Sequence, residues 1–218
     1  MIGMKVLLFA GFLGSGKTTF LNALARELAK SSSCEFPVVA IENEQGETGY
    51  GNDGFKFPVE LLAGGCICCT LSSGLGAMIK KIENTYCPEF VLIETSGMAM
   101  PGSIISLIEE YLPEVEQITT VVMYDTSKRE EVYSGLDHFL RNQLQYADYL
   151  LLNKCDLITD DVTEEIAKEL KALNARMRII KTSVVNPYEA LESISDTMLK
   201  QKKRIRFAID LMKNYRQK

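Results

Sequence analysis

The stretch GFLGSGKT at residues 11–18 decides the fold. It matches the phosphate-binding pattern G-x-x-x-x-G-K-T, and it stands between an apolar run of strand length and an amphipathic stretch of helix length. Glycines let backbone N–H groups converge on phosphate oxygens, and the N-terminus of the following helix adds positive potential. We therefore expect Lys17 to reach the outer phosphates and the Thr18 hydroxyl to bind Mg²⁺.

The rest of the chain repeats this alternation of strand and helix. Such a pattern predicts an α/β fold of the P-loop NTPase type, with a mostly parallel sheet and helices on both faces. Ligands of such sheets gather at the carboxyl ends of the strands. The expected strands are residues 5–10, 38–41, 90–93, 118–124, 149–152 and 178–181, and the expected helices are residues 18–30, 75–83, 104–112, 130–146 and 163–173.

Length and composition favour one ordinary globular core. The 218 residues are 46% hydrophobic and 24% charged, which excludes wholesale disorder or a fibre. The apolar runs are far shorter than the ~20 residues of a membrane span, and the N-terminus has no cleavage pattern of a secretory signal. We therefore expect a cytoplasmic protein, in which clustered cysteines indicate a metal or redox site rather than disulfides.

Charge is distributed unevenly along the chain. Residues 200–218 carry eight Lys or Arg and one Asp, a net +7 against −12 for the remainder. The acidic body argues against nucleic-acid binding. We expect a GTPase domain over residues 1–190 and a basic amphipathic helical tail over 191–218. That tail either docks on the body or binds a membrane surface or a partner.

Two further motifs follow predicted strands. In LIETSG, Glu94 can hold the Mg²⁺ shell through water, and the amide of Gly97 can sense the terminal phosphate. In NKCD, the Asp156 carboxylate can accept two hydrogen bonds from guanine, which adenine cannot supply, so GTP is favoured over ATP. Asn153 would brace the neighbouring loops, and the Lys154 stem could cover the base.

The segment GGCICC places Cys66, Cys68 and Cys69 within four positions. If it is extended, the first two thiolates point to one side and can share an ion, which would need further ligands from elsewhere. The acids of IENEQGE are the nearest candidates, and they border a glycine-rich loop at residues 43–57. A metal site, a redox pair and buried inert cysteines all remain open. The candidate acids are Glu42, Glu44 and Glu47.

Five motifs in order resemble the CobW branch of the CobW/HypB/UreG metallochaperone GTPases. They are GFLGSGKTTFLN, IENEQGE, ELLAGGCICCTL, FVLIETSG and ADYLLLNKCDL, and the likeness covers residues 4–185. The resemblance implies a GTPase that binds Zn²⁺ or Co²⁺ at its cysteine motif and delivers metal to a client metalloprotein or assists assembly of its metal centre. Dimerisation is plausible, since related switch proteins pair across their nucleotide sites.

The resemblance also implies roles for individual residues. Gly14, Ser15, Gly16, Lys17, Thr18 and Thr19 would hold the phosphates and Mg²⁺; Asn153 and Asp156 would hold the guanine; and Cys66, Cys68 and Cys69 would hold the metal together with Glu42 or Glu47. For hydrolysis we expect Lys17 and Glu94 to act on the phosphates and magnesium, and Glu44 to position water, with slow intrinsic turnover.

We hypothesise that GTP binding and metal binding affect each other, because the acids flank the loop that is expected to respond to the terminal phosphate. Three rival functions remain. The first is a metal-independent regulatory GTPase that gates a cobalamin- or metal-dependent enzyme. The second is a small-molecule kinase using ATP, against which Asp156 argues. The third is a redox sensor with a reversible disulfide between two of the clustered cysteines.

Overall fold

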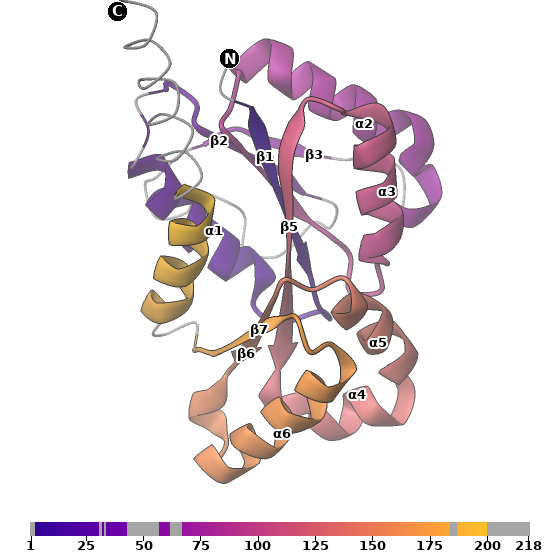
Figure 1. Cartoon of the computed structure of the whole chain (residues 1–218), viewed down its shortest axis with the longest axis vertical. Helices are drawn as coiled ribbons and strands as arrows, with labels where there is room; N and C mark the ends of the chain where they lie inside the picture. Colours follow the sequence, from indigo (N-terminus) through magenta and orange to yellow (C-terminus); the bar gives the residue numbers. More distant parts are fainter. Residues whose placement is uncertain are drawn as a thin grey trace, which may run out of the picture.

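The computed structural model describes residues 3–30, 32, 34–42, 57–61, 67–183 and 187–199, with the backbone alone for residues 67–73, 131, 133 and 134. Figure 1 shows the order of the elements along the chain. They are β1 (Met4–Ala10), α1 (Lys17–Lys30), β2 (Val38–Glu42), β3 (Val59–Leu61), α2 (Ile67–Tyr86), β4 (Phe90–Glu94), α3 (Pro101–Tyr111), β5 (Val115–Asp125), η1 (Thr126–Lys128), α4 (Arg129–Gly135), α5 (Asp137–Gln145), β6 (Tyr149–Asn153), η2 (Cys155–Leu157), α6 (Asp160–Leu173), β7 (Arg178–Lys181) and a further helix at residues 188–199.

Within the described residues the sheet has seven strands in the order β3-β2-β4-β1-β5-β6-β7, and every pairing is parallel. This confirms the predicted α/β fold. The carboxyl ends of all these strands therefore meet at one edge, and the phosphate-binding loop follows the central strand β1 at that edge.

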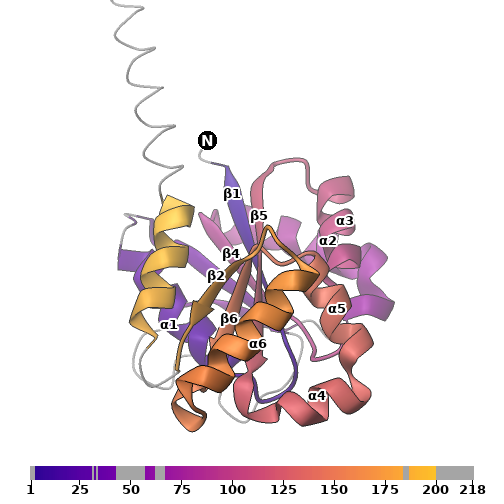
Figure 2. The same cartoon turned by 60° about the horizontal axis from the view of Figure 1, so that its bottom comes forward.

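Alternate residues of each strand face opposite layers of helices. Leu7 and Phe9 pack in a core with α1 and the helix at residues 188–199, whereas Val6 and Leu8 pack in a core with α2 and α3. A third cluster joins Ala10 and strands β5 and β6 to α5 and α6. Figure 2 shows α1 on one side of the sheet and α2, α3, α5 and α6 on the other, so helices cover both faces as predicted.

Three local expectations are wrong. The helix expected at residues 130–146 is divided into α4 and α5, with a break after Gly135, a residue of low helix propensity. The helix expected at 75–83 is longer, Ile67–Tyr86, and it continues through Gly74 and Gly76, while buried Leu75, Ile79 and Ile82 anchor its central part. Strand β3 was not expected, because its three residues are too short for periodicity to reveal.

The helix at residues 188–199 is anchored by polar and apolar contacts. The Lys5 ammonium, which is buried, donates to the Met198 carbonyl at 2.5 Å. The hydroxyls of Tyr149 and Thr197 are hydrogen-bonded at 2.6 Å. The boundary expected after residue 190 falls inside this helix, and residues 200–218, which make up most of the tail predicted over 191–218, lie outside the described residues.

No helix among the described residues is long and apolar enough to cross a membrane.

Ile194 tests how far this helix supports the fold. Its side chain is fully buried in the core shared with α1, so Ile194→Ala should lower the free energy of unfolding by about 2–4 kcal/mol through lost burial and a cavity. Urea unfolding measures the change. Tyr188, at the start of the same helix, is 76% exposed, and Tyr188→Ala should leave the unfolding midpoint nearly unchanged. Equal effects of the two substitutions would contradict this packing.

Candidate nucleotide and metal site

The phosphate-binding loop has the backbone that its glycines were expected to supply. Gly11 (φ 132°), Gly14 (φ 75°) and Gly16 (φ 101°) all have φ values that side chains disfavour. A Cβ at Gly11 would stand 2.2 Å from the carbonyl oxygen of Met123 in β5. The loop therefore lies directly against the neighbouring strand, where only glycine fits.

Lys17 opens α1 and reaches back over the loop. Its side chain is only 4% exposed, and its ammonium donates to the carbonyl oxygens of Gly11 at 2.9 Å and Phe12 at 3.3 Å. Of the other predicted phosphate ligands, Ser15 is buried and Thr19 is exposed. A cation is thus held inside the loop, next to the backbone N–H groups of the helix start, which suits an anionic phosphate chain.

The residues expected to hold magnesium meet at the strand edge. The Thr18 hydroxyl donates to a carboxylate oxygen of Glu94 at 2.8 Å, although the two residues are 76 positions apart. Hydroxyl and carboxylate oxygens are the hard ligands that Mg²⁺ prefers, directly or through water. The donor set therefore fits the ion, and Thr18 and Glu94 would hold it beside the phosphates.

The acid predicted to contribute to the transition-metal site lies next to the magnesium acid. Glu42 ends β2 and is in register with Glu94 of β4 on one side and with Leu61 of β3 on the other. Neighbouring strands are about 4.8 Å apart. Only 8% of Glu42 is exposed. Leu61, the last described residue before the cysteine segment, therefore adjoins Glu42, which itself adjoins Glu94, the candidate magnesium ligand.

Gly97, the predicted phosphate sensor, lies against the phosphate loop. A Cβ at this position would stand 3.1 Å from the backbone nitrogen of Leu13. The N–H of Ala99 donates to the carbonyl of Ser96 at 3.1 Å and closes a turn around Gly97 and Met98. The turn thus faces the loop where a terminal phosphate would bind.

The NKCD motif begins at the end of β6 and contacts the phosphate loop through Asn153. The Asn153 amide, fully buried, donates to the carbonyl of Ser15 at 2.7 Å and braces the phosphate loop. Lys154 has left-handed backbone geometry (φ 61°), and exposed Asp156 follows in η2. A carboxylate in solvent contact beside the braced loop can accept the paired N–H groups of guanine.

Sequence reasoning missed the residues that hold this motif in place. The Lys154 ammonium donates to Asp125 at 2.6 Å, and the Thr126 hydroxyl donates to the Asn153 carbonyl at 2.9 Å. Burial would raise the pKa of Asp125, but hydrogen bonds from Lys154 and Ser127 outweigh it and leave that pKa below its usual value. The available signal was the placement of an acid directly after the apolar end of β5.

The structure describes only part of the cysteine cluster. Helix α2 begins at Ile67, so the backbone of Cys68 and Cys69 is helical and not extended. Cys66, Glu44 and Glu47 lie outside the described residues. Within the described part of the chain, no group of three or more His, Cys, Asp or Glu residues is arranged to hold a metal ion.

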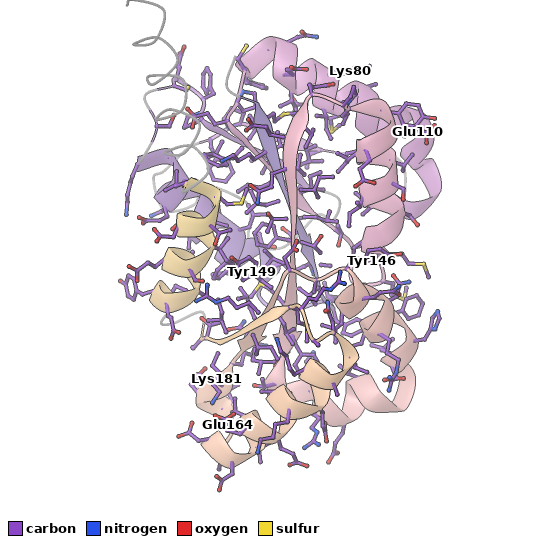
Figure 3. All side chains as sticks on the ribbon, viewed as in Figure 1. Lys80, Glu110, Tyr146, Tyr149, Glu164 and Lys181 are labelled. Carbon is purple, nitrogen blue, oxygen red and sulfur yellow. The ribbon has the colours of Figure 1, made fainter. Side chains whose placement is uncertain are left out.

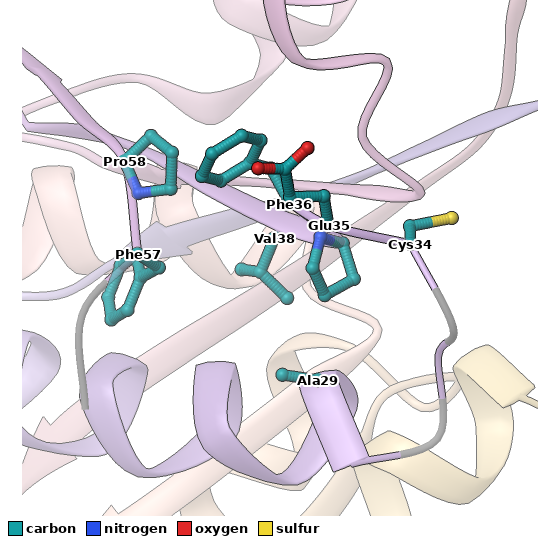
Figure 4. Close-up of a pocket in the computed structure, with 8 residues that line it drawn as sticks. Ala29, Cys34, Glu35, Phe36, Val38, Phe57 and Pro58 are labelled. Carbon is teal, nitrogen blue, oxygen red and sulfur yellow. The ribbon is translucent and has the colours of Figure 1, made fainter.

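A pocket elsewhere on the molecule does not belong to this site. It surrounds Pro37 and Val38 at the start of β2, whereas Glu42 ends that strand at the opposite edge (Figure 4). Its lining residues are Ala29, Cys34, Glu35, Phe36, Pro37, Val38, Phe57 and Pro58.

The family model described as the CobW/HypB/UreG nucleotide-binding domain matches residues 5–181. This chain belongs to that family. The match covers all seven strands and every motif named above, including the cysteine segment.

Curated relatives carry zinc-related names. The chain is 30% identical to the "Zinc chaperone YjiA" of Escherichia coli, over 79% of this chain and 55% of that protein. It is 26% identical to the "Zinc-regulated GTPase metalloprotein activator 1" of Schizosaccharomyces pombe, over 89% of this chain and 48% of that protein. The chain thus spans about half the length of these CobW/HypB/UreG relatives.

Solved structures support the fold. Hydrogenase maturation factor HypB from Archaeoglobus fulgidus superposes with a TM-score of 0.63 at 18% identity, covering 90% of this chain and 91% of that one. Zn(II)-bound YjiA GTPase from E. coli gives 0.60 at 23% identity, covering 83% and 57%. At these identities the likeness establishes the shared architecture of the family.

Asp156 tests the predicted guanine site. Removing the carboxylate in Asp156→Ala leaves the two guanine donors without an acceptor, so GDP affinity should fall about 100-fold or more. Isothermal calorimetry with GDP and ADP measures it, with Asp160→Ala in the first turn of α6 as a control acid. Unchanged GDP affinity in Asp156→Ala would contradict the assignment.

Asp125 tests the brace behind the base site. Asp125→Asn weakens the ion pair with Lys154 and should lower the free energy of unfolding at pH 7 by about 1–2 kcal/mol. Because the pKa of Asp125 is below its reference of 3.8 in the folded state, its stabilisation is complete above that value and is lost as the pH falls through the folded pKa. Urea unfolding at pH 7 and pH 3 should therefore show the difference between wild type and variant shrinking at pH 3. A difference that grows on acidification would contradict this sign.

Proposed function

We propose that this chain is the GTP-binding and GTP-hydrolysing domain of a metallochaperone, which binds Zn²⁺ or Co²⁺ as cargo and couples its release to nucleotide state. Family membership and the zinc-related names of the relatives support this proposal. It extends to a client metalloprotein as the partner that receives the metal. A homodimer, a cytoplasmic location and the absence of nucleic-acid binding belong to the same proposal.

The register across three neighbouring strands is the observation that carries the proposal. Leu61, Glu42 and Glu94 stand side by side at the carboxyl ends of β3, β2 and β4. Glu94 accepts a hydrogen bond from Thr18 of the phosphate loop. A carboxylate that binds cargo at Glu42 would therefore adjoin the carboxylate that responds to magnesium and nucleotide.

The cysteines are within reach of the same edge. Cys66 is five residues beyond Leu61, and five residues of chain span at most about 18 Å. Cys68 and Cys69 belong to the first turn of α2, and the positive end of a helix favours anionic thiolate ligands. Thiolate ligands favour Zn²⁺, and a carboxylate oxygen from Glu42 or Glu47 would also suit Co²⁺ as the bound ion. We assign the cargo site to Cys66, Cys68 and Cys69 with one of these acids.

Hydrolysis would use the phosphate loop. Magnesium, held by Thr18 and Glu94, would supply charge neutralisation between the phosphates. The Lys17 ammonium would exchange its loop carbonyls for phosphate oxygens and stabilise negative charge as the bond breaks. Glu44 is our candidate for positioning the attacking water. Slow turnover suits a switch whose two nucleotide states must persist long enough to bind and release cargo.

Zinc titration in two nucleotide states tests the proposal. Zn²⁺ should bind wild type about 5- to 150-fold more tightly with a non-hydrolysable GTP analogue than with GDP, since coupling energies of this kind are typically about 1–3 kcal/mol. Cys68→Ala should lose most zinc affinity in both states. The same titration with Co²⁺ follows the thiolate absorption bands directly.

Cys34→Ala is the matched control, because Cys34 is an exposed thiol before β2 and far from the strand ends that carry Glu42 and Glu94. It should bind zinc as wild type does. Full zinc affinity in Cys68→Ala with normal GTP binding would instead favour a metal-independent regulatory GTPase. A zinc-free protein that forms a reversible disulfide would favour a redox sensor.

A further inference from the structure

The part of α2 that begins at Leu75 is packed against the sheet. Its buried side chains, which lie in the core shared with α3, are Leu75, Ile79 and Ile82. The Lys81 ammonium also donates to the carboxylate of Glu60 in β3, at 2.9 and 3.1 Å. The exposed side of the same part carries Lys80 (Figure 3). This part of the helix is therefore held in place by its own contacts, independently of the turns that precede it.

Gly74 stands inside the helix, directly before this packed part. It is exposed, and a Cβ added there would meet no atom of the described residues within 4 Å. Close packing among these residues therefore does not require a glycine at this position. Glycine is nevertheless less favourable than alanine in a helix interior, by a factor of about five in the equilibrium between helix and coil. The helix is thus weakened at a point where space would allow a stronger helix former.

The turns before Gly74 are also composed of weak helix formers. Three of the four residues 70–73 are Thr or Ser, which have lower helix propensity than the Ala, Met and Lys residues among 77–81. A serine next to a glycine is moreover a common place for a helix to kink. The sequence therefore makes α2 weakest in the turns that carry the cysteines.

A helical backbone does not suit two neighbouring cysteines as ligands of one ion. Cys68 and Cys69 occupy consecutive positions at the start of α2. Consecutive residues of an α-helix are rotated by about 100° about its axis and do not face each other. Two thiolates that bind one tetrahedral Zn²⁺ at about 2.3 Å have their sulfurs only about 4 Å apart. An unwound backbone would let both residues turn toward the same ion.

We propose that binding of the cargo metal unwinds α2 from Ile67 to Gly74, and that residues 75–86 remain helical because their buried side keeps its contacts. In the metal-free form the positive end of the helix still favours thiolates. Unwinding then turns the cysteines toward the ion, at the cost of the helix in these turns. Because the helix re-forms when the ion leaves, this cost opposes metal binding and favours release of the cargo.

This inference rests on the proposed function, because it requires a cargo metal at the cysteines. Gly74→Ala strengthens the helical, metal-free form, so it should raise the urea midpoint of the zinc-free protein and weaken zinc binding about fivefold. Urea unfolding measures the first effect, and competition with a chromophoric chelator measures the second. The opposite signs distinguish unwinding from a merely structural role, in which a stabilising substitution would not weaken zinc binding.

Ala77→Gly is the matched control, because Ala77 is exposed in the same helix, three residues beyond Gly74. It makes the reverse exchange in the part expected to stay helical, so it should lower the urea midpoint and leave zinc affinity within about twofold. If wild type binds zinc, unchanged or tighter zinc binding in Gly74→Ala, or an equal loss in Ala77→Gly, would overturn the inference. Wild type that binds GTP but no zinc would overturn the proposed function itself.

Discussion

The parallel register of β3, β2 and β4 is the constraint on which the site depends. Because parallel strands end at the same edge, residues that close each strand become neighbours whatever their distance in sequence. Glu42 and Glu94 are 52 positions apart and yet in register, and Leu61 adjoins Glu42 on the other side. Glu42, an acid suited to binding the cargo metal, therefore lies between Glu94, an acid suited to binding magnesium, and Leu61, which precedes the cysteine segment.

Buried polar contacts make the nucleotide side of this edge one rigid unit. Asn153 joins the NKCD segment to the phosphate loop through Ser15, while Asp125 at the end of β5 and Thr126 at the start of η1 hold Lys154 and Asn153. Such groups are expensive to bury unless they are paired, and once paired they specify one arrangement.

The motifs predicted much of the arrangement of the site, because each follows an apolar strand that can be recognised from its length and composition. Gly11, Lys17, Glu94 and Asn153 all lie where a parallel sheet gathers its ligands. Sequence patterns did not predict the short β3, the early start of α2 or the break before α5, because tertiary packing overrides local propensity at these places. Asp125 and Thr126 could not be predicted for a different reason, because their roles arise only from contacts with a distant segment of the chain.

The central claim is that cargo and nucleotide are energetically linked at one sheet edge, and linkage of binding is reciprocal. The most direct test is the affinity of the wild-type protein for a non-hydrolysable GTP analogue with and without saturating zinc. We expect saturating zinc to raise the affinity for the analogue by a certain factor. The analogue should raise the affinity for zinc, relative to the nucleotide-free protein, by the same factor. Equal affinity for the analogue in the two conditions, with zinc demonstrably bound, would contradict it.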